Sequence, residues 1–285
     1  TILESGYIIP YLESQGDFSL FSSVGMTERP DTLCGKISEG RIAILVDGTP
    51  NALIVPYFFV EYFQHLDDYS MHSYFATFTR WLKYMAFFLS TLLPGLYVGI
   101  STFNPEILPG PILSKIALAV GTTPFSLMFE TIIIHLIYEI MREAGLRIPR
   151  PLGHAVSIVG ALVIGETAVS AGLIGAPTLM VVALTAISSY VIPNLYEPIS
   201  ILKFAFIIVG GLLGIWGIMI LFTLVLVNLC FKNTYGIPFT APLAPFNIFA
   251  MRDVIVRSGW SFLAKKIIKV QDFPGSEVKD RNVKR

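Results

Sequence analysis

Charged residues are scarce in this chain. Only 14% of its 285 residues are Asp, Glu, Lys or Arg, whereas 54% are hydrophobic and the mean hydropathy is +0.68. A typical soluble domain carries about 25% charged residues. This scarcity excludes an ordinary soluble globular protein, and the long apolar runs in the middle of the chain indicate a membrane protein.

Other features are missing as well. The net charge of zero gives no indication of nucleic acid as a partner. The two cysteines, Cys34 and Cys230, lie in different regions and form no metal-type cluster. They favour a reducing compartment, and a disulfide between them is the alternative. The chain has no nucleotide-binding loop, no HExxH and no GxSxG motif, so we expect neither an enzyme nor a cofactor. It also shows no signal peptide, and its start at Thr1 leads us to expect more sequence upstream.

The distribution of charge predicts three regions. Residues 1–78 are expected to be the end of a soluble or membrane-surface domain, 79–232 a transmembrane domain and 233–285 a basic cytoplasmic tail. Residues 251–285 contain nine Lys or Arg against four Asp or Glu, a net charge of +5. Arg80 and Lys83 precede the first apolar run. Because positive flanks mark the cytoplasmic side, we expect both termini there and an even number of crossings.

The first region contains a hairpin pattern. Two runs rich in β-branched residues, 41–46 and 52–55, flank Asp47-Gly48, a strong signal for a β-hairpin. A structural hairpin is the favoured interpretation, and a binding loop at Asp47 is the alternative. The aromatic segment 57–75 that follows is expected to lie where the soluble part meets the bilayer.

Five segments are candidates for membrane helices: 84–103, 125–141, 154–174, 178–192 and 201–231. We expect Pro94-Gly95 to kink the first, 104–123 to be a linker or short helix, and 201–231 to span with tilt. An even count then requires four spans plus one interfacial or re-entrant helix. The predicted fold is a polytopic α-helical membrane bundle of about four spans with a small soluble α/β flank.

The segment 125–141 is the one assigned to the interface. It contains Glu130, His135 and Glu139, and a buried charge is costly in lipid. It either packs inside a protein bundle or lies in the interface. His135 and Glu139 are four residues apart and have metal-ligand spacing, but a polar helix face is the favoured interpretation.

Several motifs together resemble a known family. The sequence runs REAGLRIP at 142–149, GHAVSIVGALVIGE at 153–166, GRIAILVDGTP at 40–50, LPGLY at 93–97, PF at 124–125 and YGIPFTAP at 235–242. In this order they resemble the A subunits of bacterial spore germinant receptors, the GerA family, over nearly the whole chain. Family members commonly have Gln where this chain has His154 and Glu166, and the family's large N-terminal soluble domain is mostly absent.

The resemblance implies a receptor subunit in the inner membrane of spores of Bacillus- or Clostridium-like bacteria. Such a subunit acts with a transporter-like B subunit, which senses the nutrient, and a lipoprotein C subunit. A-type subunits are thought to form a homo-oligomer, a ligand-gated channel that releases monovalent cations. The stage V sporulation AF proteins, a sister branch, share the same motifs.

The predicted helix 154–174 has two faces that suit a channel. One face carries Val156, Val159, Val163, Glu166 and Ser170. In an oligomeric ring of such helices the valines would form constrictions, and Glu166 would form a ring of carboxylates that favours cations. The other carries residues that permit close helix packing: Gly153, Ser157, Gly160, Thr167 and Ala171. We expect the first face to line the pore. The alternative is an ordinary buried transmembrane helix in which Glu166 pairs with Arg150 or His154 of a neighbour.

A charged, proline-containing stretch precedes this helix. Pro149 and Pro151 end one helix and restrict the residues before them to extended geometry, while Arg residues pin the turn to headgroups or to an acidic neighbour. We expect a stiff elbow that couples movement of the preceding helix to the pore helix. Its residues are Arg142, Glu143, Arg147, Pro149, Arg150 and Pro151.

Two other classes of function stay open. A non-conducting scaffold would hold the sensor subunit and relay its signal, and its valine and glycine pattern would serve packing alone. A secondary transporter would need broken helices around a site at the membrane midplane, and the absence of an internal repeat argues against it.

Overall fold

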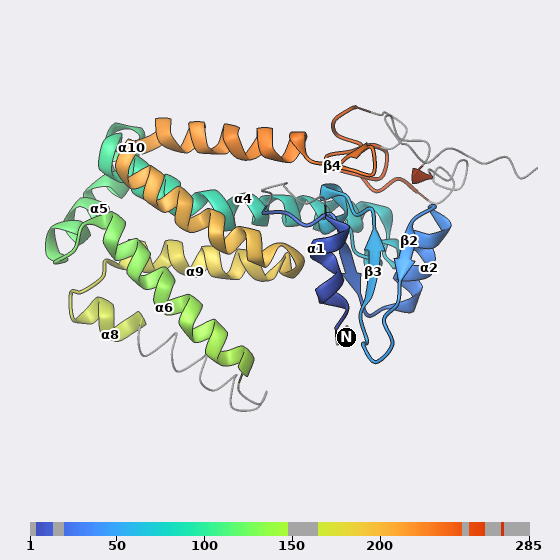
Figure 1. The fold of residues 1–285 in the computed structure, drawn as a ribbon. Coiled ribbons are helices and arrows are strands. Elements are labelled where there is room, and N and C mark those ends of the chain that lie inside the picture. Colours follow the sequence, from blue (N-terminus) through green and yellow to red (C-terminus); the bar gives the residue numbers. More distant parts are fainter. Residues whose placement is uncertain (1–3, 14–19, 148–164, 247–250, 260–268, 271–285) are drawn as a thin grey trace, which may run out of the picture. The chain divides into compact units, whose positions relative to one another are not determined.

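The computed structural model describes residues 4–13, 20–147, 165–246, 251–259 and 269–270. The chain divides into two compact units. The first unit combines both ends of the chain, Thr1–Tyr84 and Leu224–Arg285, and the second is the stretch Met85–Thr223. Their helices and strands are labelled in Figure 1. The chain therefore leaves the first unit once, builds the second, and returns.

The first unit contains a three-stranded antiparallel sheet in the order β1-β3-β2. β2 (Ile42–Ile44) and β3 (Ala52–Val55) are the two arms of the predicted hairpin, which is confirmed. β1 (Gly25–Thr27), which the sequence did not predict, pairs with the other edge of β3. β3 is buried throughout because it is the central strand. The smaller elements are α1 (Ile9–Leu12), α2 (Pro30–Ser38), α3 (Asp67–Ser70), β4 (Asn233–Thr234) and β5 (Ile237–Pro238).

Aromatic rings fill much of the core of the first unit. The ring of Phe59 meets the rings of Phe21 and Phe63 edge to face, with centroids 5.5 and 5.4 Å apart. Phe63 in turn stacks on Tyr84 at 4.3 Å. Edge-to-face and offset pairs of this kind add stability beyond the buried area. Phe59 and Phe63 therefore pack against other rings inside the fold, while the position of the segment 57–75 at the membrane interface stays a prediction.

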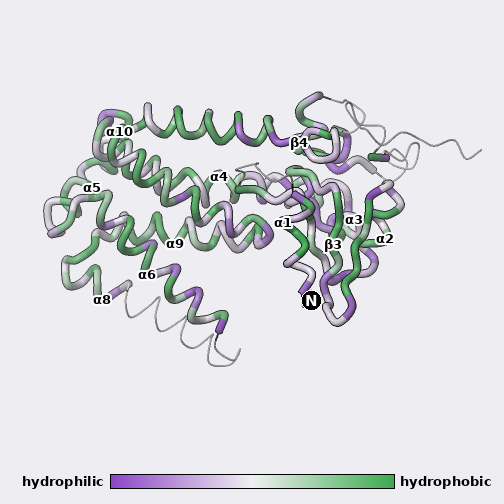
Figure 2. Tube along the Cα trace, in the orientation of Figure 1, coloured by the Kyte–Doolittle hydropathy of each residue, from purple (hydrophilic) through white to green (hydrophobic). Residues whose placement is uncertain are grey.

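Most of the described second unit is helical, and its helices are apolar (Figure 2). α4 (Ser73–Phe103) begins in the first unit and continues through Pro94. α5 (Gly110–Thr122) is a short helix within 104–123, one of the two forms expected there, and α6 (Leu127–Arg147) covers the segment that carries Glu130, His135 and Glu139. The remaining helices are α8 (Gly165–Ser170), α9 (Ala176–Tyr190) and α10 (Tyr196–Phe231), with 3-10 turns at Pro105–Ile107 and Pro193–Leu195.

α10 is broken in its middle. Gly214 has φ 63° and ψ −151°, a backbone conformation that is essentially restricted to glycine. Residues eight apart in a straight helix are separated by about 12 Å along its axis, yet the Cδ1 atom of Ile218 lies only 3.1 Å from the position of a Cβ atom built on Gly210. The helix thus folds back at Gly214, as Figure 1 shows. The prediction of a single tilted span over 201–231 is corrected to two limbs joined by a glycine.

Glycines also set the contact between α4 and the first limb of α10. A Cβ atom built on Gly95 would lie 2.7 Å from the carbonyl oxygen of Phe206, and one on Gly210 would lie 2.6 Å from the carbonyl oxygen of Gly95. One turn further along, Gly99 meets Gly210 and Gly214. Contacts that advance together along both helices make them parallel, and the absent side chains let the backbones touch.

α6 runs in the opposite direction to this limb. Its start meets the middle of α10, where a Cβ atom on Gly211 would lie 2.9 Å from the Cβ atom of Met128, and its later residue Glu139 contacts Lys203 and Tyr196. α6 is therefore antiparallel to the first limb of α10. This arrangement brings the C-terminal part of α6 beside the N-terminal part of α10, where the charged side chains gather.

By length and composition alone, two described helices, Ser73–Phe103 and Pro193–Phe231, could each cross a membrane, and the second of them is the one that folds back at Gly214. α5 and α6 pass the same test together but are bent by 80°, as in a broken span or a re-entrant loop. Over the described residues this gives two spans, or three if the bent pair counts as one. The predicted number of about four spans is not confirmed.

Candidate functional site: charged side chains among apolar helices

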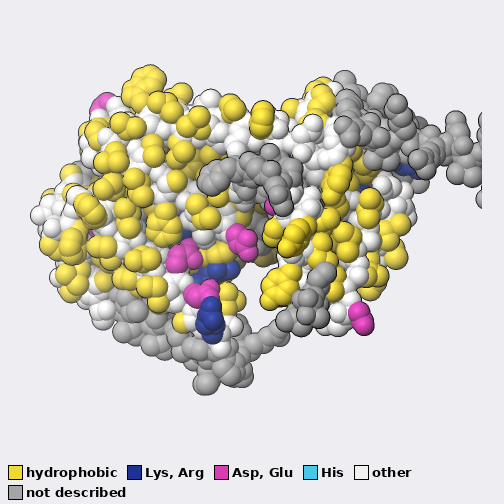
Figure 3. Space-filling view, viewed as in Figure 1, with side chains coloured by type: hydrophobic (Ala, Val, Ile, Leu, Met, Phe, Trp, Pro, Cys, Tyr) yellow, Lys and Arg dark blue, Asp and Glu magenta, His cyan; other side chains and the backbone are white. Residues whose placement is uncertain are grey.

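Hydrophobic side chains cover much of the visible face of the second unit, with acidic and basic side chains gathered in one place near α6 (Figure 3). The main group centres on Glu139 of α6. Lys203 of α10 is 1% exposed, and its Nζ atom forms an ion pair with Glu139 Oε1. Tyr196 donates its hydroxyl hydrogen to Glu139 Oε2, and Ser200 donates to Oε1 over 3.4 Å. Ionisable groups inside membrane segments are rare, and in general they mark functional sites.

The ion pair is costly to build and costly to break. Removing two charges from water is unfavourable, and their attraction compensates only when the remaining hydrogen-bonding atoms also find partners. Tyr196 and Ser200 supply those partners to Glu139. At the end of the group Arg142 lies over the Tyr196 ring, 3.0 Å from its centroid. The group therefore joins α6 to the first turns of α10 through charge rather than through apolar packing.

His135 lies one turn before Glu139 on α6 and is 1% exposed. Its Nδ1 atom is 2.9 Å from the carbonyl oxygen of Thr131, and its ring meets Phe204 edge to face at 6.2 Å. The Nε2 atom has no hydrogen-bond partner among the described residues. The part of the chain that the structure describes holds no group of three His, Cys, Asp or Glu side chains that could bind a metal. His135 and Glu139 both contact α10, through Phe204 and Lys203, so they lie on the same side of α6.

Glu130 forms a second buried acidic site, near the start of α6. It is 1% exposed, and its Oε1 atom accepts a hydrogen bond from the backbone N–H of Gly175 over 2.8 Å. Gly175 is the N-cap residue of α9, and Glu130 itself lies in the first turn of α6. A carboxylate near helix N-termini is stabilised by the partial positive charge there. Glu130 therefore ties α6 to α9.

Most of the predicted pore helix lies outside the described residues. This applies to the valines Val156, Val159 and Val163, and to the packing residues Gly153, Ser157 and Gly160. Glu166 and Ser170 of the predicted pore face are exposed on α8. Of the predicted packing face, Thr167 is exposed on α8 and Ala171 is exposed directly after it. Within the single chain these two pairs are not buried, and the pore-lining and packing roles stay predictions.

The predicted elbow is described only in its first half. Pro149, Arg150 and Pro151 lie outside the described residues. Arg147 and Glu143 form an ion pair of 2.7 Å on the surface of α6, with side chains 76% and 56% exposed. Arg142 is instead drawn to Tyr196. The elbow therefore stays a prediction, with one of its arginines in contact with α10.

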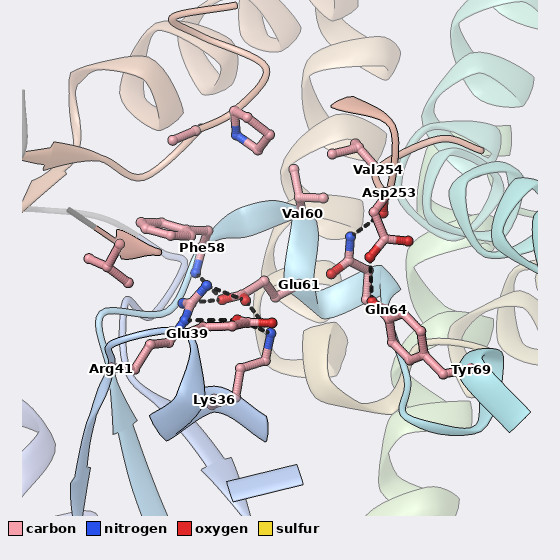
Figure 4. Close-up of a pocket in the computed structure, with 13 residues that line it drawn as sticks. Lys36, Glu39, Arg41, Phe58, Val60, Glu61, Gln64, Tyr69, Asp253 and Val254 are labelled. Carbon is pink, nitrogen blue, oxygen red and sulfur yellow. Dashed lines mark hydrogen bonds and ion pairs between the residues drawn. The ribbon is translucent and has the colours of Figure 1, made fainter. Parts of the chain in front are cut away.

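A second charged group lies in the first unit, around Glu61 (Figure 4). Arg41 contacts both carboxylate oxygens of Glu61, at 2.6 and 2.7 Å, and Lys36 reaches Oε1 at 2.6 Å. The backbone N–H of Phe58 donates to Oε2 over 2.9 Å. Burial by itself would raise the pKa of Glu61, but the charges of Arg41 and Lys36 and these hydrogen bonds hold its pKa below the ordinary value.

A small cavity of about 100 Å³ lies beside this group. On its other side, Gln64 donates to the carbonyl oxygen of Asp253 over 2.7 Å, and the hydroxyl of Tyr69 donates to the Asp253 carboxylate over 2.5 Å (Figure 4). The charged groups around the cavity already neutralise one another. We therefore interpret the cavity as part of the contact between the sheet region and the C-terminal segment around Asp253.

Arg80 is the most deeply buried charge among the described residues of the first unit. The sequence predicted it as a positive flank of the first span, but its side chain is fully buried. Its guanidinium reaches the carboxylates of Asp68 at 3.2 Å and Asp253 at 2.9 Å, and Lys83 also pairs with Asp68, at 3.0 Å. The neighbouring acid Asp68 was a signal for pairing, whereas Asp253 is too distant in the sequence to have given one. Sequence reasoning also missed Lys203, the partner of Glu139.

Comparison with known proteins assigns the chain to a family. The model of the Bacillus/Clostridium GerA spore germination protein matches residues 1–267. The chain is 42% identical to spore germination protein KA of Bacillus subtilis, over 91% of this chain and 48% of that protein. It is 37% identical to the uncharacterized membrane protein YfkQ of Bacillus subtilis, over 93% of this chain and 52% of that protein. It is also 35% identical to spore germination protein GerLA of Bacillus cereus, over 86% of this chain and 50% of that protein.

The chain thus spans about half the length of the curated relatives that it matches. No solved structure matches it. The family match covers both units and both charged groups of the second unit. On this basis the chain belongs to the GerA family of Bacillus and Clostridium spore germination proteins.

Proposed function

We propose that this chain is the membrane part of an A-type subunit of a spore germinant receptor. In this proposal the subunit forms a homo-oligomeric, ligand-gated channel in the spore inner membrane and releases monovalent cations. It acts with a transporter-like B subunit, which senses the nutrient, and a lipoprotein C subunit. The observation that carries the proposal is the family match over residues 1–267.

Buried charges among the apolar helices support the proposal. The apolar helices of the second unit hold a buried Lys203–Glu139 ion pair and a separate buried acid, Glu130. Membrane proteins retain such groups where ions or signals pass, because each one costs free energy in a low-dielectric medium. The first limb of α10 runs parallel to α4 and the second turns back, which favours both flanks of the membrane part on the same side of the membrane. The net charge of +5 in residues 251–285 is the reason to assign that side to the cytoplasm.

Reconstitution into potassium-loaded liposomes tests conduction directly. The purified protein is inserted with its B and C partners, nutrient is added, and potassium efflux is followed with an ion-selective electrode. We expect efflux only when nutrient is present. A non-conducting scaffold predicts no efflux in any combination, although the same receptor would still release ions in spores.

Two variants test the predicted pore face. Val159→Ala and Val163→Ala should each raise nutrient-independent leakage, because a smaller side chain widens a constriction that closes by dewetting. Unchanged tightness in both variants would remove this helix from the gate. Glu166→Gln should lower the preference for cations over anions in a bilayer recording, and an unchanged reversal potential would assign Glu166 to a structural pair.

A further inference from the structure

We propose that a cavity beside Glu130 binds a small organic cation, an alkylammonium ion with an apolar body. The cavity has a volume of about 410 Å³ and lies within the second unit. Glu130, Ile133 and Ile137 line it from α6, and Ala168 and Ile174 line it from α8 and the turn after it. Its volume is in the range of ligand pockets, which combine mostly apolar walls with a few polar groups.

The carboxylate of Glu130 is only half used by the protein. Its Oε1 atom accepts the N–H of Gly175, while Oε2 has no hydrogen-bond partner among the described residues. Buried polar atoms normally have partners, and an exception calls for a ligand, an ion or a water molecule. Glu130 thus offers a buried acceptor beside a cavity whose other lining side chains are apolar except for Thr167, and a bound cation reaches Oε2 after a small shift of the side chains that shield it.

Glu139 shows how the same helix treats an acid that the protein does neutralise. Both of its oxygens have partners on α10, and Lys203 provides the opposite charge. For Glu130 the described part of the chain provides no Lys or Arg within ion-pair distance. Two helix N-termini favour its negative charge, but neither supplies a counter-charge. The described residues therefore supply no counter-charge to an ionised Glu130.

The walls determine which cation fits. A dehydrated inorganic ion needs several oxygen ligands, and besides Glu130 the side chains that line this cavity offer only the hydroxyl of Thr167. An alkylammonium ion donates a charge-assisted hydrogen bond to a carboxylate and places its methylene groups against apolar side chains. A free amine and the headgroup of phosphatidylethanolamine share this chemistry.

The test compares a charged and a neutral ligand of the same shape. The full chain is placed in nanodiscs of phosphatidylcholine and phosphatidylglycerol, which carry no primary amine. Binding of n-hexylammonium and of hexan-1-ol is measured by calorimetry. We expect hexylammonium to bind about tenfold more tightly or better, because a hydrogen bond to a charged group contributes at least that factor. Equal affinity for both ligands would mean that the cavity binds them only through apolar contacts, and binding of neither would mean that it holds no such ligand. Either result would overturn the proposal.

Two variants locate the effect. Glu130→Gln keeps an oxygen that can accept the Gly175 N–H but removes the charge, so hexylammonium should lose its advantage over hexanol. Glu143→Gln, the same change on the exposed surface of α6, is the matched control and should have no effect. Ala168→Phe fills the cavity while Glu130 itself is kept, and it should weaken both ligands. Undiminished preference for hexylammonium in Glu130→Gln would overturn the assignment to this site.

A final arm separates the two sources of the ammonium group. Nanodiscs that contain phosphatidylethanolamine should weaken hexylammonium binding in the parent protein if the lipid occupies the site, and should leave it unchanged if the natural ligand is a free amine. In either case the effect must depend on Glu130. The proposal does not rest on channel activity, so its failure would leave the proposed function intact.

Discussion

The two units of this protein handle buried charge and close packing differently. In the first unit, buried charges form networks with several partners each: Glu61 has two cations and Arg80 two carboxylates. In the second unit, charges are few, and Lys203 and Glu139 depend on each other. The first unit packs aromatic rings together, whereas the second brings glycine backbones into contact. The difference teaches that redundancy of partners, not burial alone, decides how vulnerable a buried charge is.

The largest effect is expected where a buried acid of the second unit has a single ion-pair partner. Lys203→Met removes that partner from Glu139, and removal of one partner of a buried pair costs about 3–5 kcal/mol. Unfolding of the protein in detergent should show this loss. The double variant Lys203→Met/Glu139→Met should recover most of it, because two apolar side chains of similar size replace the pair. A double variant as unstable as the single one would contradict this account.

A smaller loss is expected for an acid with two cationic partners in the first unit. Glu61→Gln at neutral pH should lower the free energy of unfolding by about 2–3 kcal/mol, since Arg41 and Lys36 lose a buried acceptor charge but keep other contacts. Thermal unfolding measures this loss, with Glu28→Gln on the surface as the control. Equal changes in Glu61→Gln and Glu28→Gln would show that the network contributes nothing.

The same residue makes a prediction about pH. The pKa of Glu61 is lowered in the folded state, so its contribution is present above the unfolded pKa of about 4.3 and is lost as the pH falls through the folded pKa. The free energy of unfolding of the parent protein should therefore decrease as the pH is lowered below about 5. The fall should be shallower in Glu61→Gln, and identical profiles would argue against a charged Glu61.

Close glycine packing in the second unit predicts a loss of about 1–3 kcal/mol for Gly210→Ala, because the new Cβ atom would press on the backbone of Gly95. Gly121→Ala in α5 is the matched control, since a Cβ atom there meets nothing within 4 Å. Alanine is a better helix former than glycine, so this control should be neutral or slightly stabilising. The comparison of packing modes fails if both variants behave alike.

The smallest effect is expected at the surface of α6. Arg147 and Glu143 are both exposed, and exposed ion pairs contribute about 0.5 kcal/mol or less. Arg147→Ala should therefore leave stability and protein level nearly unchanged. If the proposed elbow couples the sensor to the channel, nutrient-triggered ion release from spores should still fall. Loss of the protein itself would mean that Arg147 has only a structural role.

Local patterns predicted local structure well. The hairpin around Asp47-Gly48 formed as expected because its signal, a turn dipeptide between two β-rich runs, involves only neighbouring residues. The helices α9 and α10 also follow apolar runs that the sequence displays directly. The break in α10 was not predicted: four glycines interrupt the run, and nothing local singles out Gly214 as the one that takes φ 63°.

Membership of an apolar, helical membrane family is written in the sequence, because low charge and long hydrophobic runs are sums over residues that need no partner. The roles of individual charges were decided by the tertiary structure. Arg80 was expected to be a flank and became a buried centre because Asp253 lies beside it in space. Glu139 and Lys203, 64 residues apart, meet because α6 and α10 run antiparallel. The role of a charged side chain depends on its distance to other charges, and for residues far apart in the sequence that distance is set only when the helices pack.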